Sequence, residues 1–482
     1  MKKVLKLNLN RHKKRFICTF IGSIIYLNSI MGLLGIGQYS VYITSYFHHY
    51  DEKINIQSGN LMSPILMLFL SLSSPLGGIF EHKLGMHLTL IICSILIELL
   101  IFIFILLKNI YITFAILILL GICIGTCSTL PRKNICLYYP EKKGILMGLM
   151  TSCLILFIAN INVIGEKIIN PNKIILKEGE TYYPLDIAKN YIKFYKLMLI
   201  IIPIGTILSL LLIKKYDPSI KYNDQIEKLD KSNISNQNNK KDENYSKNIK
   251  AAIINSRIWR LAAVLIFTNF TIDFALSTFR VYGALISING SVMQYSPLFI
   301  ALSNIIFGPL WGYIIDKLQN FKLMRLVCIV FLIDSIIISI FIQSNIIYMT
   351  CLMVGMIFNG GLHSTIHPHI MRIYGMKYYI EIGGVISITT GIFSILKAGL
   401  SFLISFYYHT GKELQKPYRI TYIVGTGLNI LAFYLATKEK EQPFIYPNSL
   451  NNEIFNNTEI SNNEKINHLS QNEVKIEGNL KI

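Results

Sequence analysis

The sequence predicts an all-α membrane protein with twelve transmembrane helices in two pseudo-symmetric halves of six. Three observations lead to this prediction. Of the 482 residues, 52% are hydrophobic and only 15% are charged, which is more apolar surface than one soluble core needs. Twelve apolar stretches are long enough to cross a hydrocarbon core, at about 20 residues each. A short string also occurs twice, 234 residues apart, which indicates a duplicated membrane domain.

The apolar stretches form two groups of six, separated by a polar segment. They lie at residues 17–47, 60–80, 87–107, 110–131, 144–165, 194–213, 258–285, 294–315, 323–343, 346–367, 380–407 and 418–436.

The chain divides by composition into five parts. The segment between the two groups and the end of the chain are rich in Asn and Lys and have no apolar period, a composition typical of disorder. The expected parts are a basic cytosolic N-terminal tail (1–16), an N-terminal six-helix half (17–213), a disordered cytosolic linker (214–250), a C-terminal six-helix half (251–437) and a disordered cytosolic tail (438–482).

The basic residues indicate that both termini are cytosolic. The first fifteen residues contain seven Lys or Arg and no acid, and the apolar stretch after them is too long for the apolar region of a cleaved signal peptide. We expect this stretch to be the first span. Basic side chains also lie in alternate short loops, at Lys83, Lys142, Lys317 and Arg372, which places those loops in the cytosol. Both a plasma membrane and an organelle membrane remain open.

Several functional classes are excluded. The net charge of +19 would suggest nucleic acid in a soluble protein, but here the basic residues lie in tails and loops beside apolar spans. No two of the eight cysteines form a CxxC pair, so the sequence has no redox motif of this kind. No phosphate-binding loop, HExxH or GxSxG motif occurs. We therefore expect no enzyme activity, cofactor or metal, and a monomer whose partners are the lipid bilayer, a small molecule, and a proton or counter-anion.

The repeated string carries a family resemblance. Residues 75–85 read PLGGIFEHKLG and residues 309–319 read PLWGYIIDKLQ. They resemble the Gly-x-x-x-Asp-Arg/Lys-x-Gly-x-Arg/Lys signature that the major facilitator superfamily of secondary transporters carries after its second and eighth spans. The resemblance implies two six-helix halves that rock about a midplane site.

The same resemblance implies a conformational lock at the two strings. The second copy keeps the family's Gly, Asp and Lys, whereas the first has a His at the Asp position, preceded by a Glu that can substitute for it. The expected lock residues are Gly78, Glu81, His82, Lys83, Gly85, Gly312, Asp316 and Lys317. A lock that includes a His is expected to respond to cytosolic pH.

A narrower resemblance concerns three later segments. Residues 138–148 read YYPEKKGILMG, which resembles the WFPDKRGxAxG run of the oxalate/formate antiporter branch and, more loosely, of monocarboxylate porters. The same branch carries Phe-Gly-x-Lys after its span ten, which YGMK at residues 374–377 resembles. It carries Ala-Lys-Gly in its span eleven, which LKAG at residues 396–399 resembles. Because the lysine of its span eleven contacts substrate carboxylate, the resemblance implies that Lys397 binds an anion.

Lys397 also stands out on physical grounds alone. It lies deep within the predicted span 380–407, where a central charge costs roughly 2.5–3.5 kcal/mol. Such a charge requires a partner or a function. The alternative is that the side chain snorkels to the outer interface.

Asp273 and Arg280 are two further charges within one predicted span. Seven residues separate them, so they share a helix face but lie about 10.5 Å apart along the axis. Asp273 therefore needs another partner, either Lys397 or Arg280 through water. We expect Arg280 to bind substrate and Asp273 to carry a coupling proton. The structural alternative is a permanent ion pair that locks spans seven and eleven together.

Polar side chains inside other spans complete the candidate site. His363 and His367 are four residues apart on one helix face, and His363 is the candidate for proton coupling, with a solvated or capping role as the alternative. The uncharged candidates for substrate binding in the midplane cavity are Gln38, Tyr39, Tyr42, Thr126, Asn304 and Asn359. Most polar side chains of the first half are expected to join helices rather than touch ligand.

The function these observations favour is secondary active transport by alternating access. The expected substrate is a small organic anion, such as a monocarboxylate or dicarboxylate, moved by proton symport or anion exchange. Two alternatives remain. One is a transporter of a neutral or cationic solute, such as an amino acid, vitamin or drug, and the other is a transporter-like receptor without flux.

Overall fold

The computed structural model describes residues 2–54, 56–172, 174, 182–216, 238–286, 288, 290–318, 322–407, 415–439 and 444. The chain forms two compact units. The larger unit comprises residues 1–224 and 257–441 and contains both six-helix halves. The smaller unit comprises residues 225–256 and 442–482. The secondary structure of the described residues is entirely helical, as expected.

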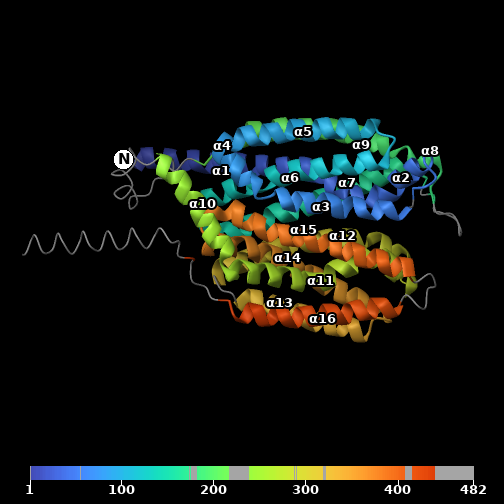
Figure 1. Ribbon diagram of the computed structural model, residues 1–482. Helices are drawn as coiled ribbons and strands as arrows, with labels where there is room; N and C mark the ends of the chain where they lie inside the picture. The colour runs from blue at the N-terminus through green and yellow to red at the C-terminus, as the bar shows by residue number, and fades with distance from the viewer. Residues whose placement is uncertain are drawn as a thin grey trace, which may run out of the picture. The chain divides into compact units, whose positions relative to one another are not determined.

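The N-terminal half contains six membrane-length helical segments (Figure 1). The first is continuous through a short 3-10 turn and the second is a bent pair. Its elements are α1 (Lys2–Met31), η1 (Gly32–Gly35), α2 (Ile36–His48), η2 (Ile56–Leu61), α3 (Met62–Ser73), α4 (Leu76–Leu84), α5 (Met86–Leu106), α6 (Ile110–Tyr138), η3 (Pro140–Lys142), α7 (Lys143–Ile169), α8 (Leu185–Ala188) and α9 (Tyr191–Leu212).

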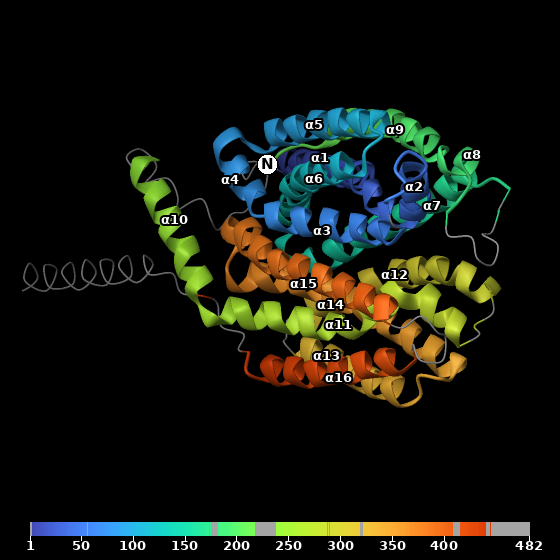
Figure 2. The ribbon, with the colours of Figure 1, turned by 45° about the vertical axis from the view of Figure 1, so that its right-hand side comes forward.

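The C-terminal half repeats this plan, and the two halves lie side by side with their helices running along a common direction (Figures 1 and 2). Its elements are α11 (Ser256–Leu285), α12 (Gly290–Leu318), α13 (Lys322–Ile340), α14 (Asn345–Ile373), η5 (Met376–Tyr378), α15 (Tyr379–Tyr407) and α16 (Gln415–Thr437).

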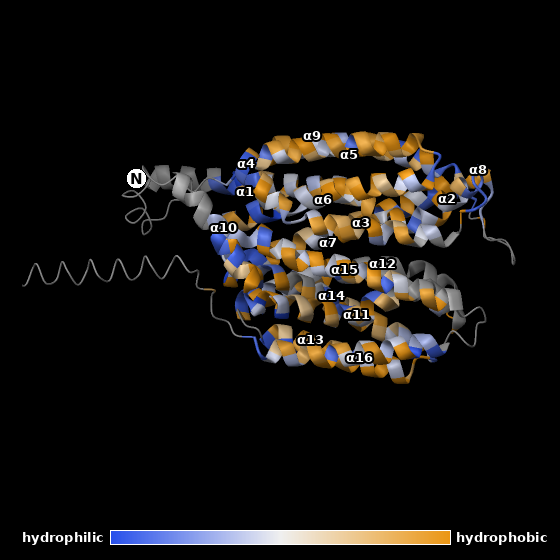
Figure 3. Ribbon diagram, in the orientation of Figure 1, coloured by the Kyte–Doolittle hydropathy of each residue, from blue (hydrophilic) through white to orange (hydrophobic). Residues whose placement is uncertain are grey.

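The predicted spans fall on these helices. Among the described residues, ten helices are long and apolar enough to cross a membrane, and the α3–α4 pair, bent by 48°, is an eleventh. The eighth predicted span falls on α12, whose 29 residues extend over about 43 Å at about 1.5 Å per residue. Figure 3 shows hydrophobic residues along the middle of the bundle and hydrophilic residues gathered at its two ends, as a bilayer requires.

The segment expected to be a disordered linker contains ordered parts. At its start, the Lys214 carbonyl accepts hydrogen bonds from Asn134 Nδ2 at 2.9 Å and Tyr138 Oη at 3.1 Å, so the chain after α9 is fastened to α6. Near its end, α10 (Asn238–Ile254) is helical. Tyr245, Ile249 and Ile253 recur there every four residues, a helical spacing that outweighs the polar composition.

Two seams join the halves, and glycines make both possible. Along the first, α7 packs on α12: a side chain at Gly144 would collide with the backbone of Gly312, and the Ser152 hydroxyl donates to the Asn304 carbonyl at 2.7 Å. Along the second, α15 packs on α3 and on the turn that follows it, where a Cβ added to Gly384 would lie 2.6 Å from the nitrogen of Pro75. Small residues permit this close approach of backbones, as is usual between membrane helices.

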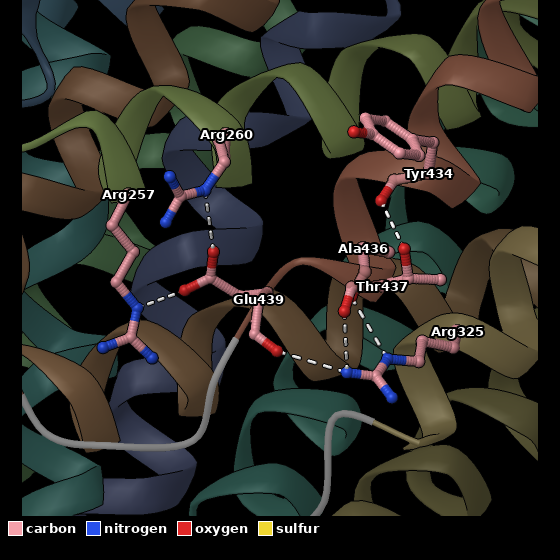
Figure 4. Close-up of polar contacts among 7 residues, drawn as sticks. All are labelled: Arg257, Arg260, Arg325, Tyr434, Ala436, Thr437 and Glu439. Carbon is pink, nitrogen blue, oxygen red and sulfur yellow. Dashed lines mark hydrogen bonds and ion pairs between the residues drawn. The ribbon is translucent and has the colours of Figure 1, made fainter.

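A cluster of three arginines fastens the end of α16 to the C-terminal half (Figure 4). The buried carboxylate of Glu439 pairs with Arg257 and with Arg260, both on α11. Arg325 of α13 donates from Nε to the Ala436 carbonyl at 3.1 Å and from Nη2 to the Glu439 carbonyl at 3.2 Å. These carbonyls at the α16 terminus lack intrahelical donors, so the arginines cap the helix and join three spans.

Candidate substrate site between the two halves

A cavity of about 290 Å³ lies between the halves. The N-terminal half contributes α1, α3 and α6, and the C-terminal half contributes α11, α14 and α15. The lining residues are Met31, Leu70, Ser71, Ser74, Ser128, Thr129, Arg132, Leu265, Ile266, Asn269, Asp273, Ile366, His367, Ile370, Gly383, Ile386, Ser387, Thr390, Phe393, Ser394 and Lys397.

One face of α15 forms a polar wall of this cavity. Its lining positions recur every three or four residues from Gly383 to Lys397, which keeps them on one side of the helix. Ser387, Thr390 and Ser394 each donate their hydroxyl hydrogen to a carbonyl one turn earlier. Each oxygen therefore keeps lone pairs that can accept a hydrogen bond from a solute.

Lys397 and Asp273 form an ion pair in the cavity wall. Lys397 Nζ on α15 lies 2.5 Å from Asp273 Oδ2 on α11. The side chains are 13% and 34% exposed, so the pair faces the cavity rather than being fully enclosed. Of the partners considered for Asp273 from sequence, the structure therefore shows Lys397.

Arg132 of α6 is the second cation of the cavity. Its Nη2 lies 3.8 Å from the sulfur of Met31, while its buried Nε has no hydrogen-bond partner among the described residues. The adjacent hydroxyl of Thr129 is likewise buried without a described partner. The sequence suggests that Arg132, at the inner end of span four, meets substrate from the cytosolic side, but Arg132 is not among the candidate binding residues predicted above. The sequence signal for this role is an arginine in the last part of the helix that ends at Tyr138, directly after Pro131.

His367 lines the cavity beside this arginine end. Its Nδ1 lies 3.1 Å from the hydroxyl of Tyr379, the first residue of α15. His363, expected to couple protons, and Arg280, expected to bind substrate, have side chains outside the described residues. Both assignments stay predictions.

The uncharged candidates of the first half lie away from the cavity lining. Gln38 is exposed. The buried Tyr39 donates to the Ile161 carbonyl at 3.1 Å, and Tyr42 donates to Glu166 Oε1 at 2.7 Å, so both join α2 to α7. Thr126 donates to a carbonyl of its own helix.

The two asparagine candidates of the second half are also absent from the lining. Asn304 is buried at the α7–α12 seam, and a Cβ added to Gly360 would lie 3.0 Å from its Oδ1. Asn359 is half-buried and its Oδ1 has no described hydrogen-bond partner. Contact of these side chains with substrate stays a prediction, to be tested in another conformation.

The second copy of the repeated string connects the halves. Asp316 at the end of α12 accepts hydrogen bonds from the backbone nitrogens of Gly144 and Ile145, both at 2.9 Å. These amides belong to the first turn of α7, where unpaired N–H groups and the helix dipole favour a carboxylate. Arg372 of α14 lies 3.9 Å away. The exposed Lys317 lies 4.9 Å from the ring centroid of Tyr313.

The first copy is built differently. Glu81 pairs with Lys133 at 2.7 Å, which joins α4 to α6 within the N-terminal half. His82 and Lys83 are exposed. Gly85, with φ of 84°, has the positive φ that favours glycine and lets the chain turn between α4 and α5.

The first copy nevertheless contacts the other half, through Gly78. A Cβ at this position would collide with the carboxyl group of Glu381, a buried residue in the first turn of α15. Sequence reasoning did not single out Glu381, because a first-turn acid is common at any helix start. We refer to the end of the bundle that carries both strings as the repeat end. In the described residues it is closed by these contacts of Gly78, Asp316 and Gly384.

Comparison with known proteins assigns the family. The sequence model of the protein family "Major Facilitator Superfamily" matches residues 41–398, about three quarters of the chain. The chain therefore belongs to the major facilitator superfamily: it is a multi-pass integral membrane protein and a secondary transporter, not an enzyme. No curated protein matches the sequence.

Solved transporters share the fold over nearly their whole length. The human organic anion transporter MFSD10 (TETRAN) has a TM-score of 0.58 at 12% identity, covering 88% of this chain and 99% of that one. The proton:xylose symporter XylE, bound to 6-bromo-6-deoxy-D-glucose, has a TM-score of 0.62 at 11% identity, covering 90% and 98%. The transporter FucP in the outward conformation has a TM-score of 0.58 at 14% identity, covering 87% and 99%. At such identities the likeness establishes the fold alone.

Proposed function

We propose that this transporter moves a small organic anion, a monocarboxylate or dicarboxylate, by proton symport or anion exchange. The observation that supports this proposal is the charge of the cavity wall. Two cations, Arg132 and Lys397, line the cavity against one carboxylate, Asp273. A desolvated site with an excess cation favours an anionic ligand. The resemblance of residues 138–148 and 396–399 to the oxalate/formate and monocarboxylate branch agrees with this choice.

The ion pair supplies a route to coupling. A substrate carboxylate at Lys397 competes with Asp273 for the same ammonium. A proton on Asp273 removes that competition, so substrate and proton favour each other's binding and symport follows. In an anion-exchange mechanism, a second anion takes the place of the first and again compensates the positive charge of Lys397. Arg280, seven residues further along α11, stays a predicted ligand of the substrate.

Alternating access follows from the two seams. The repeat end is closed in this structure, and its opening requires Asp316 to leave the α7 amides and α15 to separate from α4. We infer that the repeat end is cytosolic, because Lys83, Lys142 and Lys317 lie at the ends of its helical segments. Both termini are then cytosolic, in a plasma membrane or an organelle membrane.

Uptake into liposomes tests the function. Purified protein is reconstituted, and uptake of labelled lactate, formate, oxalate and succinate is measured with and without a pH gradient. We expect saturable uptake of at least one carboxylate, and its loss in Lys397→Ala at equal protein content. Normal carboxylate uptake by Lys397→Ala would remove the proposed role of this lysine.

A neutral solute is the second candidate, and the polar wall of α15 favours it. Ser387, Thr390 and Ser394 present hydroxyl oxygens that suit a solute rich in hydroxyl groups. The same liposomes are therefore offered labelled xylose, glucose and amino acids. Uptake of one of these with no inhibition by carboxylates would favour this candidate, and binding without any flux would favour a receptor.

A further inference from the structure

We propose that Arg132 of α6, together with Thr129, holds the single carboxylate of a monoanionic substrate at the repeat end of the cavity. The inference rests on the proposed transport of organic anions and narrows it in two ways. It adds a residue of the N-terminal half, beyond Lys397 on the path of the anion, and it selects monocarboxylates over dicarboxylates.

The first reason is that Arg132 keeps unused bonding capacity. A guanidinium has five N–H donors in a planar fork. In the described residues its only hydrogen-bonding contact is the weak one to the sulfur of Met31, and its Nε is buried without a partner. Lys397 differs, because Asp273 already neutralises it at 2.5 Å.

The second reason is the unpaired hydroxyl beside it. Thr129 lies three residues before Arg132, on the same face of α6, and both line the cavity. The Thr129 hydroxyl is buried without a described partner. A buried donor without an acceptor costs about 1–3 kcal/mol, and a carboxylate that binds both side chains removes this cost. The planar guanidinium of Arg132 and the hydroxyl of Thr129 together offer donors that suit a planar carboxylate.

The third reason is the net charge of the wall. Apart from the imidazole of His367, the lining side chains that carry charge are Arg132, Lys397 and Asp273, which sum to one positive charge. A monoanion brings the loaded cavity to zero. A dianion leaves it at minus one, which a desolvated site resists. A monoanion at Arg132 therefore needs no further compensating charge from the wall.

The position of Arg132 fits the end of a transport path. It lies six residues before Tyr138, the last residue of α6, hence about 9 Å from that helix end. Lys397 lies eighteen residues into α15, about 27 Å from its start. Both of these helix ends lie at the closed repeat end. A ligand entering from the opposite side passes the level of Lys397 before it reaches Arg132.

The test measures both binding and transport. Purified full-length protein is titrated with lactate and with succinate at pH 7.5, with thermal stabilisation as the binding readout, and uptake of both is measured in liposomes. We expect lactate to bind about tenfold more tightly than succinate or better. Arg132→Gln should weaken lactate binding about tenfold or more, Arg132→Lys should recover part of it, and Thr129→Val should weaken it by a smaller factor.

Two controls separate this inference from a general loss of fold. Lys196→Gln removes an exposed cation on α9 that does not line the cavity, and it should leave lactate affinity unchanged. Asp186→Asn removes an exposed carboxylate outside the cavity lining, and it should also leave lactate affinity unchanged. Tighter binding of succinate than lactate, or unchanged lactate affinity in a folded Arg132→Gln protein, would overturn the inference but leave anion transport standing. Absence of binding and uptake of every carboxylate by the wild type would instead defeat the proposed function.

Discussion

Lys397 of α15 and Asp273 of α11 compensate each other across the C-terminal half, with 2.5 Å between Nζ and Oδ2. A lysine deep in an apolar span needs such a partner. Because both side chains also line the cavity between the halves, the pair that stabilises this half is open to disturbance by a ligand or a proton. We therefore propose that stability and transport are linked at this contact.

Removal of one member of this pair should harm the protein more than removal of both. Lys397→Gln leaves the Asp273 carboxylate without its cation, and Asp273→Asn leaves the ammonium uncompensated. In the double variant neither charge remains. We expect a coupling free energy of roughly 0.5–3 kcal/mol in a double-mutant cycle, measured as thermal unfolding in detergent. Additive losses in the two single variants would show that the pair contributes nothing.

Asp316 should control the closed repeat end. Asp316→Ala removes the two hydrogen bonds that the carboxylate accepts from the α7 amides of Gly144 and Ile145. A hydrogen bond to a charged group typically contributes about 1.5–3 kcal/mol to stability. We expect the conformational equilibrium to shift toward an open repeat end. The measurement is labelling of a cysteine introduced at Ser128, which lines the cavity, by a membrane-impermeant reagent applied from the repeat-end side.

The equivalent position of the first repeat copy provides the comparison. His82 is exposed, whereas Glu81 is paired with Lys133 inside the N-terminal half. His82→Ala should therefore change the labelling rate less than Asp316→Ala. The expected response of the lock to cytosolic pH is tested by His82→Asp, and an unaltered pH profile of transport would rule out that role for His82.

Gly312 should tolerate no side chain. A Cβ there would collide with the backbone of Gly144 at the α7–α12 seam. Gly312→Ala should cost about 1–3 kcal/mol of stability, as overpacking does, and should slow closure of the repeat end. The matched control is Gly399→Ala on α15, where an added Cβ would meet nothing within 4 Å. Equal melting temperatures of the two variants would contradict the tight seam.

Glu439 should stabilise the fold without affecting the affinity for substrate. Glu439→Gln removes the anion that compensates Arg257 and Arg260 near the α16 terminus (Figure 4). We expect a loss of about 3 kcal/mol or more, since the carboxylate is 2% exposed and its removal leaves buried charge. Asp186→Asn breaks an exposed pair with Lys189 and should cost under about 1 kcal/mol. A change in substrate KM in Glu439→Gln would contradict a purely structural role.

The architecture could be predicted from the sequence alone. Apolar length gave the helices, the offset of 234 residues gave two halves, and the cost of a buried charge made Lys397 and Asp273 conspicuous. Each of these signals lies within one segment or between two copies of one string. Such signals can be read from the sequence without knowledge of how the helices pack.

The contacts between residues of different helices became visible only in the folded protein. Lys397 and Asp273 are 124 positions apart in the chain, Asp316 bonds to amides 172 and 171 positions away, and Arg132 faces a cavity that six helices enclose. These relationships depend on the rotation and depth of each helix against its neighbours, which interhelix packing sets. The tyrosines at 39 and 42 illustrate the limit, because polarity alone cannot separate a residue that binds a solute from one that joins two helices.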